Sequence, residues 1–304
     1  MKPMEHKPLR YAYFTGCVAR GTCPELHRST VELCKKLGIE LWEMTGATCC
    51  GAGVIRDEHP ELQAALNART LAMAEQQGMQ IMNVCATCQQ NLAHDAQALR
   101  EGPDLRARAG ALLAPSGLAG FSPLGGTVQV KHLLWVLVAD YGLERLAAQV
   151  TNPLTGLRVA AFYGCHLLRP PDETGFDDPD HPTSFDDVIT TLGATPVDYA
   201  GKTRCCGFHI LATQEDTATA MAVRRLEEAA DAGADLMVTA SPLCHLALDA
   251  YQPRARRVQD IPGKMPVVHL AQLVGLACGI APGALQLNRN VVAPQRALAM
   301  VLPE

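Results

Sequence analysis

Short apolar runs recur along this chain, and several are too short to be helices. Residues 80–84 and 235–239 are largely apolar and lead directly into the segments that contain Cys85 and Ser241. Apolar runs of four to eight residues are typical of strands buried on both faces of a sheet. We therefore predict a buried strand at each run, with a loop of chemical interest at its end.

Three longer stretches have apolar residues at helical spacing. We predict helices at residues 25–37 and 60–77, and a further helix at residues 127–148. The last of these separates the two halves of the chain. We therefore expect it to cover the junction between them.

Two segments are harder to assign. Residues 102–126 are rich in Gly, Pro and Ala, which predicts a loop insertion or a mobile arm. Residues 267–278 have the pattern of an amphipathic helix. That helix would pack either on a partner or on this chain's own domain, and the sequence leaves both possibilities open.

The two halves of the chain resemble each other. The segment from Tyr11 to Cys17 matches the segment from Val159 to Cys165, and a Leu-Gly pair recurs after the first predicted helix of each half. Repetition of this kind indicates duplicated structure. Each half then follows the order strand, helix, strand and cysteine-bearing loop. We predict an α/β protein with two pseudo-symmetric domains, at residues 9–150 and 151–304.

The cysteines repeat with the same plan. The first half contains a single cysteine, a vicinal pair and a C-x-x-C, and the second half contains the same series except that a serine replaces one thiol. The same number of residues, 34, separates Cys50 from Cys85 and Cys206 from Ser241. The positions concerned are Cys17, Cys49, Cys50, Cys85 and Cys88, and then Cys165, Cys205, Cys206, Ser241 and Cys244.

Composition narrows the class of protein. The chain has 304 residues and a net charge of −5, and its basic residues form no stripe beyond the cluster at residues 254–257, so we expect no nucleic-acid partner. No apolar run is long enough to span a bilayer, and residues 1–10 lack the apolar core of a secretory signal. We therefore expect a cytoplasmic protein without transmembrane segments. In that reducing compartment, twelve cysteines favour metal binding or redox catalysis over disulfides.

Several thiolates that converge from separate loops suit iron-sulfur ligation. Five thiols in the first half exceed the four of a tetrahedral zinc site, although cysteine spacing alone leaves zinc open for either half. A thioredoxin-like dithiol at Cys85 and Cys88 would leave Cys17, Cys49 and Cys50 without a role, so we do not favour it.

The repeated pattern resembles the CCG-domain family, in which HdrB, the CCG-domain subunit of heterodisulfide reductase, is the best match. The similarity spans both halves of the chain. The second-half motifs are especially close to HdrB: Tyr163-Gly-Cys-His-Leu-Leu-Arg-Pro170, Asp177-Asp-Pro179, Cys205-Cys-Gly207 and Pro242-Leu-Cys-His245. The resemblance implies two noncubane [4Fe-4S] clusters, each held by five cysteines on loops at strand ends. It also implies that both clusters face a cavity where a disulfide is split into two thiols.

Carried over residue by residue, the resemblance assigns the five first-half cysteines to a noncubane cluster. The second cluster would use Cys165, Cys205, Cys206 and Cys244, with Ser241 in the fifth place. A hydroxyl is a harder and weaker ligand than a thiolate. The second site is therefore expected to hold a four-cysteine [4Fe-4S] cluster of the cubane type or an oxygen-ligated variant, and cleavage by two equivalent clusters is in doubt.

The resemblance further implies a function and partners. We expect the iron-sulfur catalytic subunit of a heterodisulfide-reductase-like complex, with the complex of sulfur-oxidising bacteria as the better match. It would reduce a disulfide, or oxidise a thiol or sulfane sulfur, on a small sulfur substrate or a carrier-bound thiol. Electrons would pass through a ferredoxin-like subunit, HdrC, to a flavoprotein subunit, HdrA. The alternatives are an electron-transfer CCG subunit of a lactate- or glycolate-oxidising complex and a zinc-stabilised scaffold.

Three histidines adjoin second-half cysteines, namely His166, His209 and His245. An imidazole titrates near neutral pH, so these residues are candidates to deliver protons to a substrate thiolate. A purely structural, hydrogen-bonded role is equally open. Three cysteines lie outside the repeated plan. We expect Cys34 and Cys278 to be buried in the core, and we leave the role of Cys23 open.

Overall fold

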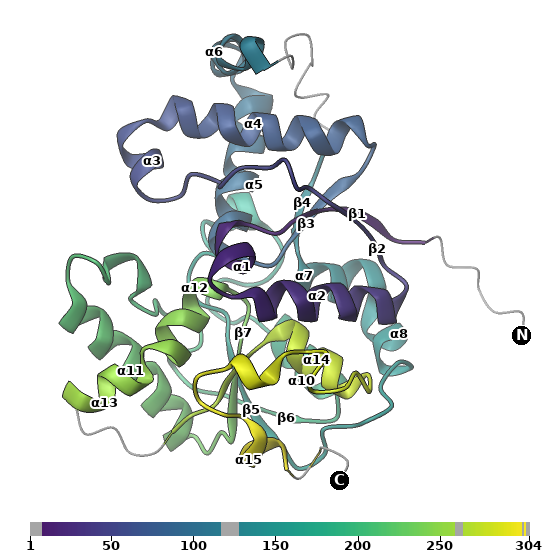
Figure 1. Cartoon of the computed structure of the whole chain (residues 1–304), viewed down its shortest axis with the longest axis vertical. Coiled ribbons are helices and arrows are strands. Elements are labelled where there is room, and N and C mark those ends of the chain that lie inside the picture. Colours follow the sequence, from purple (N-terminus) through teal and green to yellow (C-terminus); the bar gives the residue numbers. More distant parts are fainter. Residues whose placement is uncertain (1–7, 117–127, 259–263, 300, 302–304) are drawn as a thin grey trace, which may run out of the picture.

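The computed structural model describes residues 8–116, 128–258, 264–299 and 301, and it contains two four-stranded parallel sheets (Figure 1). The strand orders are β2-β1-β3-β4 and β6-β5-β7-β8. The first sheet comprises β1 (Arg10–Phe14), β2 (Glu40–Glu43), β3 (Gln80–Asn83) and β4 (Val130–His132). The second comprises β5 (Arg158–Phe162), β6 (Thr195–Val197), β7 (Leu236–Thr239) and β8 (Val267–His269). The predicted α/β class and the internal duplication are confirmed.

The register of the strands shows how closely the two sheets correspond. Phe14 of β1 pairs with Asn83 of β3, and Phe162 of β5 pairs with Thr239 of β7. Each of these pairs lies at the carboxyl end of its strands. The positions two residues beyond β3 and β7 are therefore structurally equivalent, and so are the loops that follow them.

Helices connect the strands in both halves. The first half contains α1 (Cys17–Gly21), α2 (Pro24–Leu37), α3 (Val54–Glu58), α4 (Pro60–Gln76), α5 (Ala86–Glu101), α6 (Pro103–Leu113), α7 (Leu133–Trp135) and α8 (Leu143–Ala147). The second contains α9 (Pro171–Thr174), α10 (Ser184–Thr191), α11 (Glu215–Asp231), α12 (Pro242–His245), α13 (Gln252–Val258), α14 (Leu270–Ala277) and α15 (Gln295–Leu298). The predicted helices at 25–37 and 60–77 are confirmed as α2 and α4, each of which has proline in its first turn, where no backbone N–H is needed.

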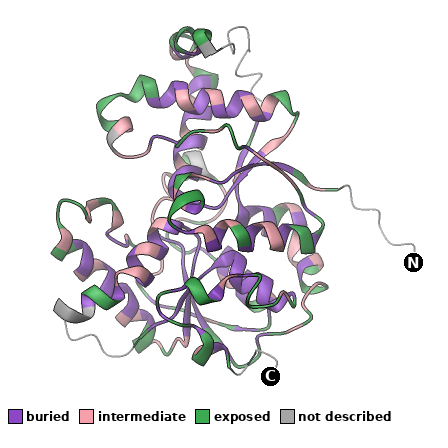
Figure 2. Cartoon of the chain, viewed as in Figure 1, coloured by how far each residue is buried: buried purple, intermediate pink, exposed green. Residues whose placement is uncertain are grey.

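The core consists of three layers of side chains separated by the two sheets. Tyr13 of β1 and Ala161 of β5 belong to a central layer that also contains α2, α7, α10 and α14. Phe14 points outward to α4, α5 and α6, and Phe162 points outward to α11 and α12. Successive strand residues face opposite sides of a sheet, so strands covered on both sides must be apolar throughout. In Figure 2, β5, β7 and α14 are coloured as buried along most of their length, whereas the edge strand β2 is exposed or half-buried.

The predicted loop insertion at residues 102–126 is wrong for its first half. Residues Pro103–Leu113 form α6, which packs on α4, and a short 3₁₀ turn follows at Ala114–Ser116. The alanine and leucine content of this stretch favours a helix, and Pro103 occupies the first turn, where it is tolerated. Residues 117–126 lie outside the described part of the chain.

Two helices begin later than predicted. The stretch at 127–148 opens with β4, continues through α7 and a π-type turn at Val136–Gly142, and ends with α8; residue 127 itself is not described. The stretch at 267–278 opens with β8 and becomes helical at Leu270. In both cases a three-residue strand completes a sheet, because β-branched valines suit a pleated, buried position.

Helix α14 is buried on all sides and is therefore not amphipathic. It packs on α2 of the first half, which settles the choice between a partner and this chain's own fold in favour of the latter. The proposed division of the chain near residue 150 stays a prediction. Within the described residues, no helix is both long and apolar enough to cross a membrane.

Candidate functional site

The five cysteines of the first half come together beyond the carboxyl ends of the strands. Cys17 follows β1, Cys49 and Cys50 lie in the loop after β2, and Cys85 and Cys88 follow β3. The Sγ atoms of Cys17 and Cys49 are 3.6 Å apart, and those of Cys50 and Cys88 are 3.5 Å apart. Parallel strands deliver their loops to the same edge of a sheet, so residues that are distant in sequence meet there.

These separations identify the kind of contact. A disulfide would place two sulfurs about 2.05 Å apart. Two thiolates that share one tetrahedral metal at about 2.3 Å have their sulfurs roughly 3.7 Å apart. The observed distances between Cys17 and Cys49 and between Cys50 and Cys88 lie near the second value. Hydrogen bonds between free thiols have the same spacing, so the distances exclude disulfides, and it is the convergence of five soft ligands at one place that fits an iron-sulfur cluster.

A cavity of about 190 Å³ adjoins these thiols. All five first-half cysteines line it. Its other wall comes from the second half, through Phe208, His209, Pro242 and Leu243. The first site is thus completed by the second half of the chain.

The second-half cysteines form a matching group. The thiols follow one another as neighbours, because Cys205 perturbs the pKa of Cys165, Cys165 and Cys206 perturb that of Cys205, and Cys205 and Cys244 perturb that of Cys206. The Cys205 Sγ also accepts a hydrogen bond from the backbone N–H of Gly207 at 3.3 Å. Four neighbouring thiols fit a cluster with four cysteine ligands.

Ser241, which occupies the fifth position of the second-half pattern, has a side-chain contact with the first half. It is 2% exposed, and its Oγ lies 3.9 Å from the Sγ of Cys85, across the boundary between the halves. Cys85 and Ser241 each stand two residues beyond equivalent strands. The two sites therefore approach each other at this pair.

The thiols perturb one another in the same way in both groups. The hydrogen bond between Cys17 and Cys49 raises the pKa of Cys17 and lowers that of Cys49. Likewise, the hydrogen bond between Cys165 and Cys205 raises the pKa of Cys165 and lowers that of Cys205. Each pair of neighbouring thiols is therefore electrostatically linked, in the same way in both halves.

The three candidate histidines separate into two places. His166 Nδ1 lies 3.0 Å from Thr87 Oγ1, and His209 Nε2 lies 3.5 Å from the same oxygen. Both are beside the first-half cavity, and His209 lines it. His245 instead faces Asp249, with its Nε2 3.4 Å from Oδ2, and it lies away from that cavity.

Sequence reasoning missed residues that shape the site. Thr87 is one that it could have found, because it stands between Cys85 and Cys88. Asn67 gave no such signal. Its amide donates to the backbone carbonyl of Cys50 at 3.0 Å and also to the carboxylate of Asp95, and all three residues are buried.

Cys34 and Cys278 are buried in the central core, as predicted. Cys23, whose role the sequence left open, is also buried and contacts Glu25. It does not line the thiol cavity.

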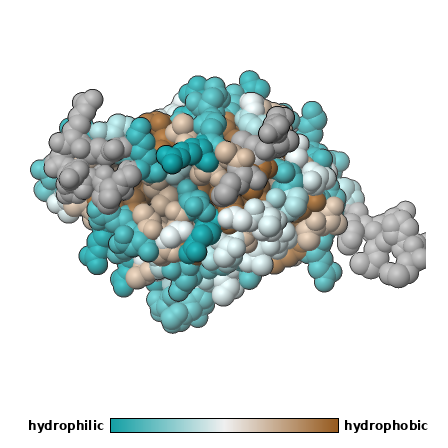
Figure 3. All heavy atoms as spheres, turned by 90° about the horizontal axis from the view of Figure 1, so that it is seen from below, coloured by the Kyte–Doolittle hydropathy of each residue, from teal (hydrophilic) through white to brown (hydrophobic). Residues whose placement is uncertain are grey.

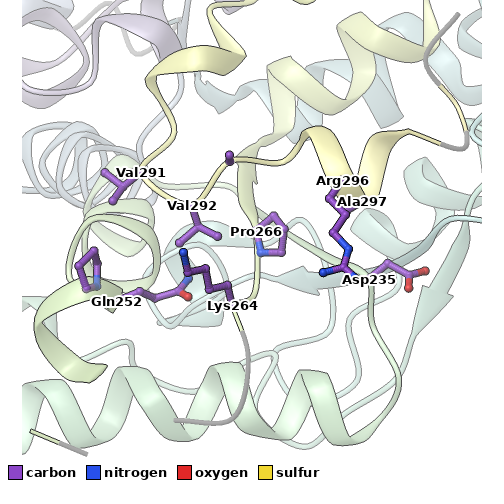
Figure 4. Close-up of a pocket in the computed structure, with 10 residues that line it drawn as sticks. Asp235, Gln252, Lys264, Pro266, Val291, Val292, Arg296 and Ala297 are labelled. Carbon is purple, nitrogen blue, oxygen red and sulfur yellow. The ribbon is translucent and has the colours of Figure 1, made fainter. Parts of the chain in front are cut away.

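Another cavity, of about 900 Å³, lies in the second half around Pro266, Val291 and Val292, with Lys264 and Arg296 at its edges (Figure 4). The described residues that line it include no cysteine, so the thiol chemistry is not located there. Figure 3 shows that hydrophobic residues on the lower face lie among hydrophilic ones. Of the large hydrophobic residues described, those classed as exposed are Leu62, Leu112 and Val291.

Comparison with known proteins identifies the family of the chain. The cysteine-rich domain called CCG matches residues 11–93 and 159–249. The 8-methylmenaquinol:fumarate reductase membrane anchor subunit of Wolinella succinogenes is 38% identical over 93% of this chain and 96% of that protein. The HdrB subunit of the ferredoxin:CoB-CoM heterodisulfide reductase of Methanosarcina mazei is 30% identical over 93% of this chain and 94% of that protein.

A solved structure shares the fold. The crystal structure of a hypothetical protein from Helicobacter pylori superposes with a TM-score of 0.74 and 14% identity, covering 94% of this chain and 52% of the other. At this level of identity the match speaks to the fold alone.

Proposed function

The chain belongs to the family of CCG cysteine-rich-domain proteins that includes HdrB of heterodisulfide reductase, and on that premise we propose that it is the catalytic iron-sulfur subunit of an oxidoreductase complex. Its reaction would be the reduction of a disulfide, or in reverse the oxidation of a thiol or sulfane sulfur. The substrate would be a small sulfur compound or a carrier-bound thiol.

One observation carries the catalytic part of the proposal. The five first-half thiols line a cavity that the second half closes from the other side. A cluster held by these thiols would occupy the space between them in either candidate, so the space alone does not favour catalysis. What supports a substrate site is the opposite wall from the second half, which brings His209 to the cavity as a protein group beside the redox group.

The thiols supply the proposed ligands. Cys17, Cys49, Cys50, Cys85 and Cys88 would hold a noncubane cluster, and Cys165, Cys205, Cys206 and Cys244 would hold a second [4Fe-4S] cluster of the cubane type. Such clusters supply one-electron chemistry and an iron able to bind a substrate sulfur. Ser241, turned toward Cys85, supports a second cluster with a different ligand set from the first.

Side chains of this protein would transfer the protons that the reaction consumes. Splitting a disulfide into two thiols consumes two electrons and two protons. His209 lines the cavity and is exposed to solvent, so we propose that it passes protons inward. Thr87 and His166 would position it, because both histidines meet at the Thr87 hydroxyl. His245 lies elsewhere and is not part of this proposal.

Electrons would be exchanged with other subunits. The heterodisulfide reductase relatives are named as subunits of ferredoxin-dependent enzymes, which supports a complex with the ferredoxin-like HdrC and the flavoprotein HdrA. Cys17 and Cys49 are exposed, so electrons could enter from a docked partner at that edge.

A second candidate is an electron-transfer subunit without substrate chemistry. Two observations favour it: the relative named after methylmenaquinol and fumarate is 38% identical, and Ser241 removes the equivalence of the two sites. In that case the chain would relay electrons between a quinol-linked site and another subunit.

A direct assay separates these candidates. The complete chain, purified without oxygen, is mixed with reduced viologen and a low-molecular-weight disulfide, and new thiols are counted. Catalysis predicts thiol production that falls to background in Cys88→Ser and slows in His209→Gln. Viologen oxidation limited to the cluster electrons, with no new thiol, would favour the relay. Zinc without acid-labile sulfide in the same sample would indicate a scaffold.

A further inference from the structure

A different set of metal-type ligands lies between the two halves. Cys23 stands at the start of α2, Glu25 lies in the first turn of that helix, and His269 ends β8. All three are buried, and one ligand atom of each lies within 4.8 Å of the others. They lie outside both the lining of the thiol cavity and the repeated cysteine plan.

His132 occupies the position in the first half that His269 occupies in the second, so the contacts of the two histidines can be compared. It ends β4 as His269 ends β8, because Asn83 pairs with His132 and Thr239 pairs with His269. The Nε2 atom of His132 lies 2.7 Å from the backbone carbonyl oxygen of Ala240, to which it donates. The Nε2 atom of His269 instead faces the carboxylate of Glu25.

The distance between these two groups is informative. The Nε2 atom of His269 lies 3.5 Å from the carboxylate oxygen of Glu25. A histidine donating to a carboxylate is normally about 2.7–2.9 Å from it. Nitrogen and oxygen ligands at about 2.0 Å from one tetrahedral metal stand roughly 3.3 Å apart. The observed spacing is thus closer to that of two ligands on a shared cation than to that of a good hydrogen bond.

The charged groups around the three residues favour a bound cation. Glu25 forms an ion pair with Arg289 at 3.2 Å through its other oxygen. Asp249 is 1% exposed and lies close enough to influence Cys23 electrostatically. Asp249 itself is held by His245 at 3.4 Å and by the backbone N–H groups of Val291 and Val292, so the guanidinium of Arg289 is paired with Glu25 alone. A divalent cation that displaced the Cys23 proton would bring the group, Asp249 included, to neutrality, which burial favours.

The ligand types point to a class of metal. One thiolate, one imidazole and one carboxylate are the donors that zinc accepts, whereas calcium and magnesium prefer oxygen alone. The Nε2 atom of His269 faces the carboxylate of Glu25, so the nitrogen that would bind the metal is directed toward another of the proposed ligands.

We propose that Cys23, Glu25 and His269 bind one zinc-type divalent cation that cross-links the two halves of the chain. Two ligands come from the first half and one from the second, at the place where α2 packs on α14. Three protein ligands leave a fourth position for solvent. Binding releases the proton of Cys23 and needs no oxidant or reductant. The site is independent of the proposed sulfur chemistry.

The test measures zinc and its surroundings in the complete protein. After anaerobic purification, the protein is equilibrated with one equivalent of Zn(II) and desalted, and its iron, sulfide and zinc contents are determined. Zinc K-edge X-ray absorption then counts the sulfur ligands. The proposal predicts about one zinc per chain, with one sulfur at about 2.3 Å and nitrogen or oxygen ligands at about 2.0 Å. Zinc that had entered the cluster positions would show mostly sulfur ligands.

Substitutions of the proposed ligands test whether these residues bind the zinc. Cys23→Ser and His269→Gln should lose this zinc while iron and sulfide stay at the wild-type level. Cys34→Ser, which alters another buried cysteine on α2, should keep it. Absence of zinc from the wild type, a sulfur-rich shell, or zinc content unchanged in both ligand variants would overturn the proposal. If a ligand variant fails to fold, the sulfur count of the wild-type zinc still decides.

Discussion

The hydroxyl of Ser241 lies 3.9 Å from the thiol of Cys85, although the two residues occupy equivalent positions in opposite halves of the chain. Equivalent positions can meet only near the axis that relates the two halves. The asymmetry of the sequence, a serine in place of a cysteine, is therefore located where the two candidate sites come closest.

Replacing Ser241 tests whether its oxygen matters. In Ser241→Cys the second group gains a fifth thiol, a softer ligand, and we expect the EPR spectrum of the second cluster to change toward that of the first. Ser241→Ala is the matched variant, because it removes the oxygen without adding a sulfur. If the oxygen is a ligand, both variants alter the second signal. Spectra identical to wild type in both would contradict a cluster beside residue 241.

Gly164 should be indispensable for the second site. It has φ of 70°, and a Cβ there would lie 3.2 Å from the Sγ of Cys244. Gly164→Ala should cost about 1–2 kcal/mol of backbone strain and also displace Cys244, with loss of iron. Gly156→Ala is the control, since Gly156 has φ of 88° and open space around its Cβ position. Equal iron content in the two variants would refute the steric argument.

Asn67 is expected to hold the vicinal cysteine loop in place. Asn67→Leu removes the shorter of two side-chain hydrogen bonds to the Cys50 carbonyl, the other coming from Gln63, and it also removes one donor to Asp95; the loss should cost about 1 kcal/mol or more. Urea unfolding measures the loss, and the rate of iron release to a chelator reports on the loop. Thr70→Val, which removes a bond within α4, should leave iron release unchanged. Equal release rates in all three proteins would argue against this role.

His132 should make stability depend on pH. Burial lowers its pKa to about 4 from an ordinary value near 6.5, against hydrogen bonds to the Ala240 and Val84 carbonyls that favour the charged form. Above pH 6.5 its contribution is complete, and it is lost as the pH falls toward 4, because the unfolded chain binds the proton more readily. The total loss should be on the order of 3 kcal/mol.

The matched variant for this effect is His132→Asn, in which asparagine can still cap α7. Urea midpoints of the two proteins are compared between pH 7 and pH 4. The wild type should lose more stability than the variant over that interval, since other buried histidines are common to both. Parallel curves would show that His132 does not titrate in this range.

The pattern of apolar residues was sufficient to predict the secondary-structure elements that occur in both halves. The strands that end before Cys85 and Ser241 were predictable because apolar runs flanked by matching cysteines occur twice. Strands β4 and β8 were not, because three residues give too short a pattern to distinguish a strand from the helix that follows it. Helix α6 was not predicted, because its segment is rich in alanine, glycine and proline and this composition suggested a loop.

For the site, spacing predicted which cysteines group together but not how the groups face each other. The approach of Ser241 to Cys85 and the wall that Phe208 provides for the first cavity depend on packing between the halves. No local pattern encodes contacts across more than a hundred residues. The separation of His245 from His166 and His209 has the same origin, since each follows a different strand end.

The shared cavity bears on the ancestry of the molecule. Pro242 and Leu243 of the second half line the cavity of the first-half thiols, where Cys50, Cys85 and Cys88 are buried, so one half in isolation would leave that wall open. A protein with a single copy of the unit would have needed a second molecule to enclose its thiols. The internal duplication has the arrangement that fusion of such a homodimer would give, with position 85 near the symmetry axis. A single chain can also carry cysteine at one of two equivalent positions and serine at the other, which two identical chains cannot.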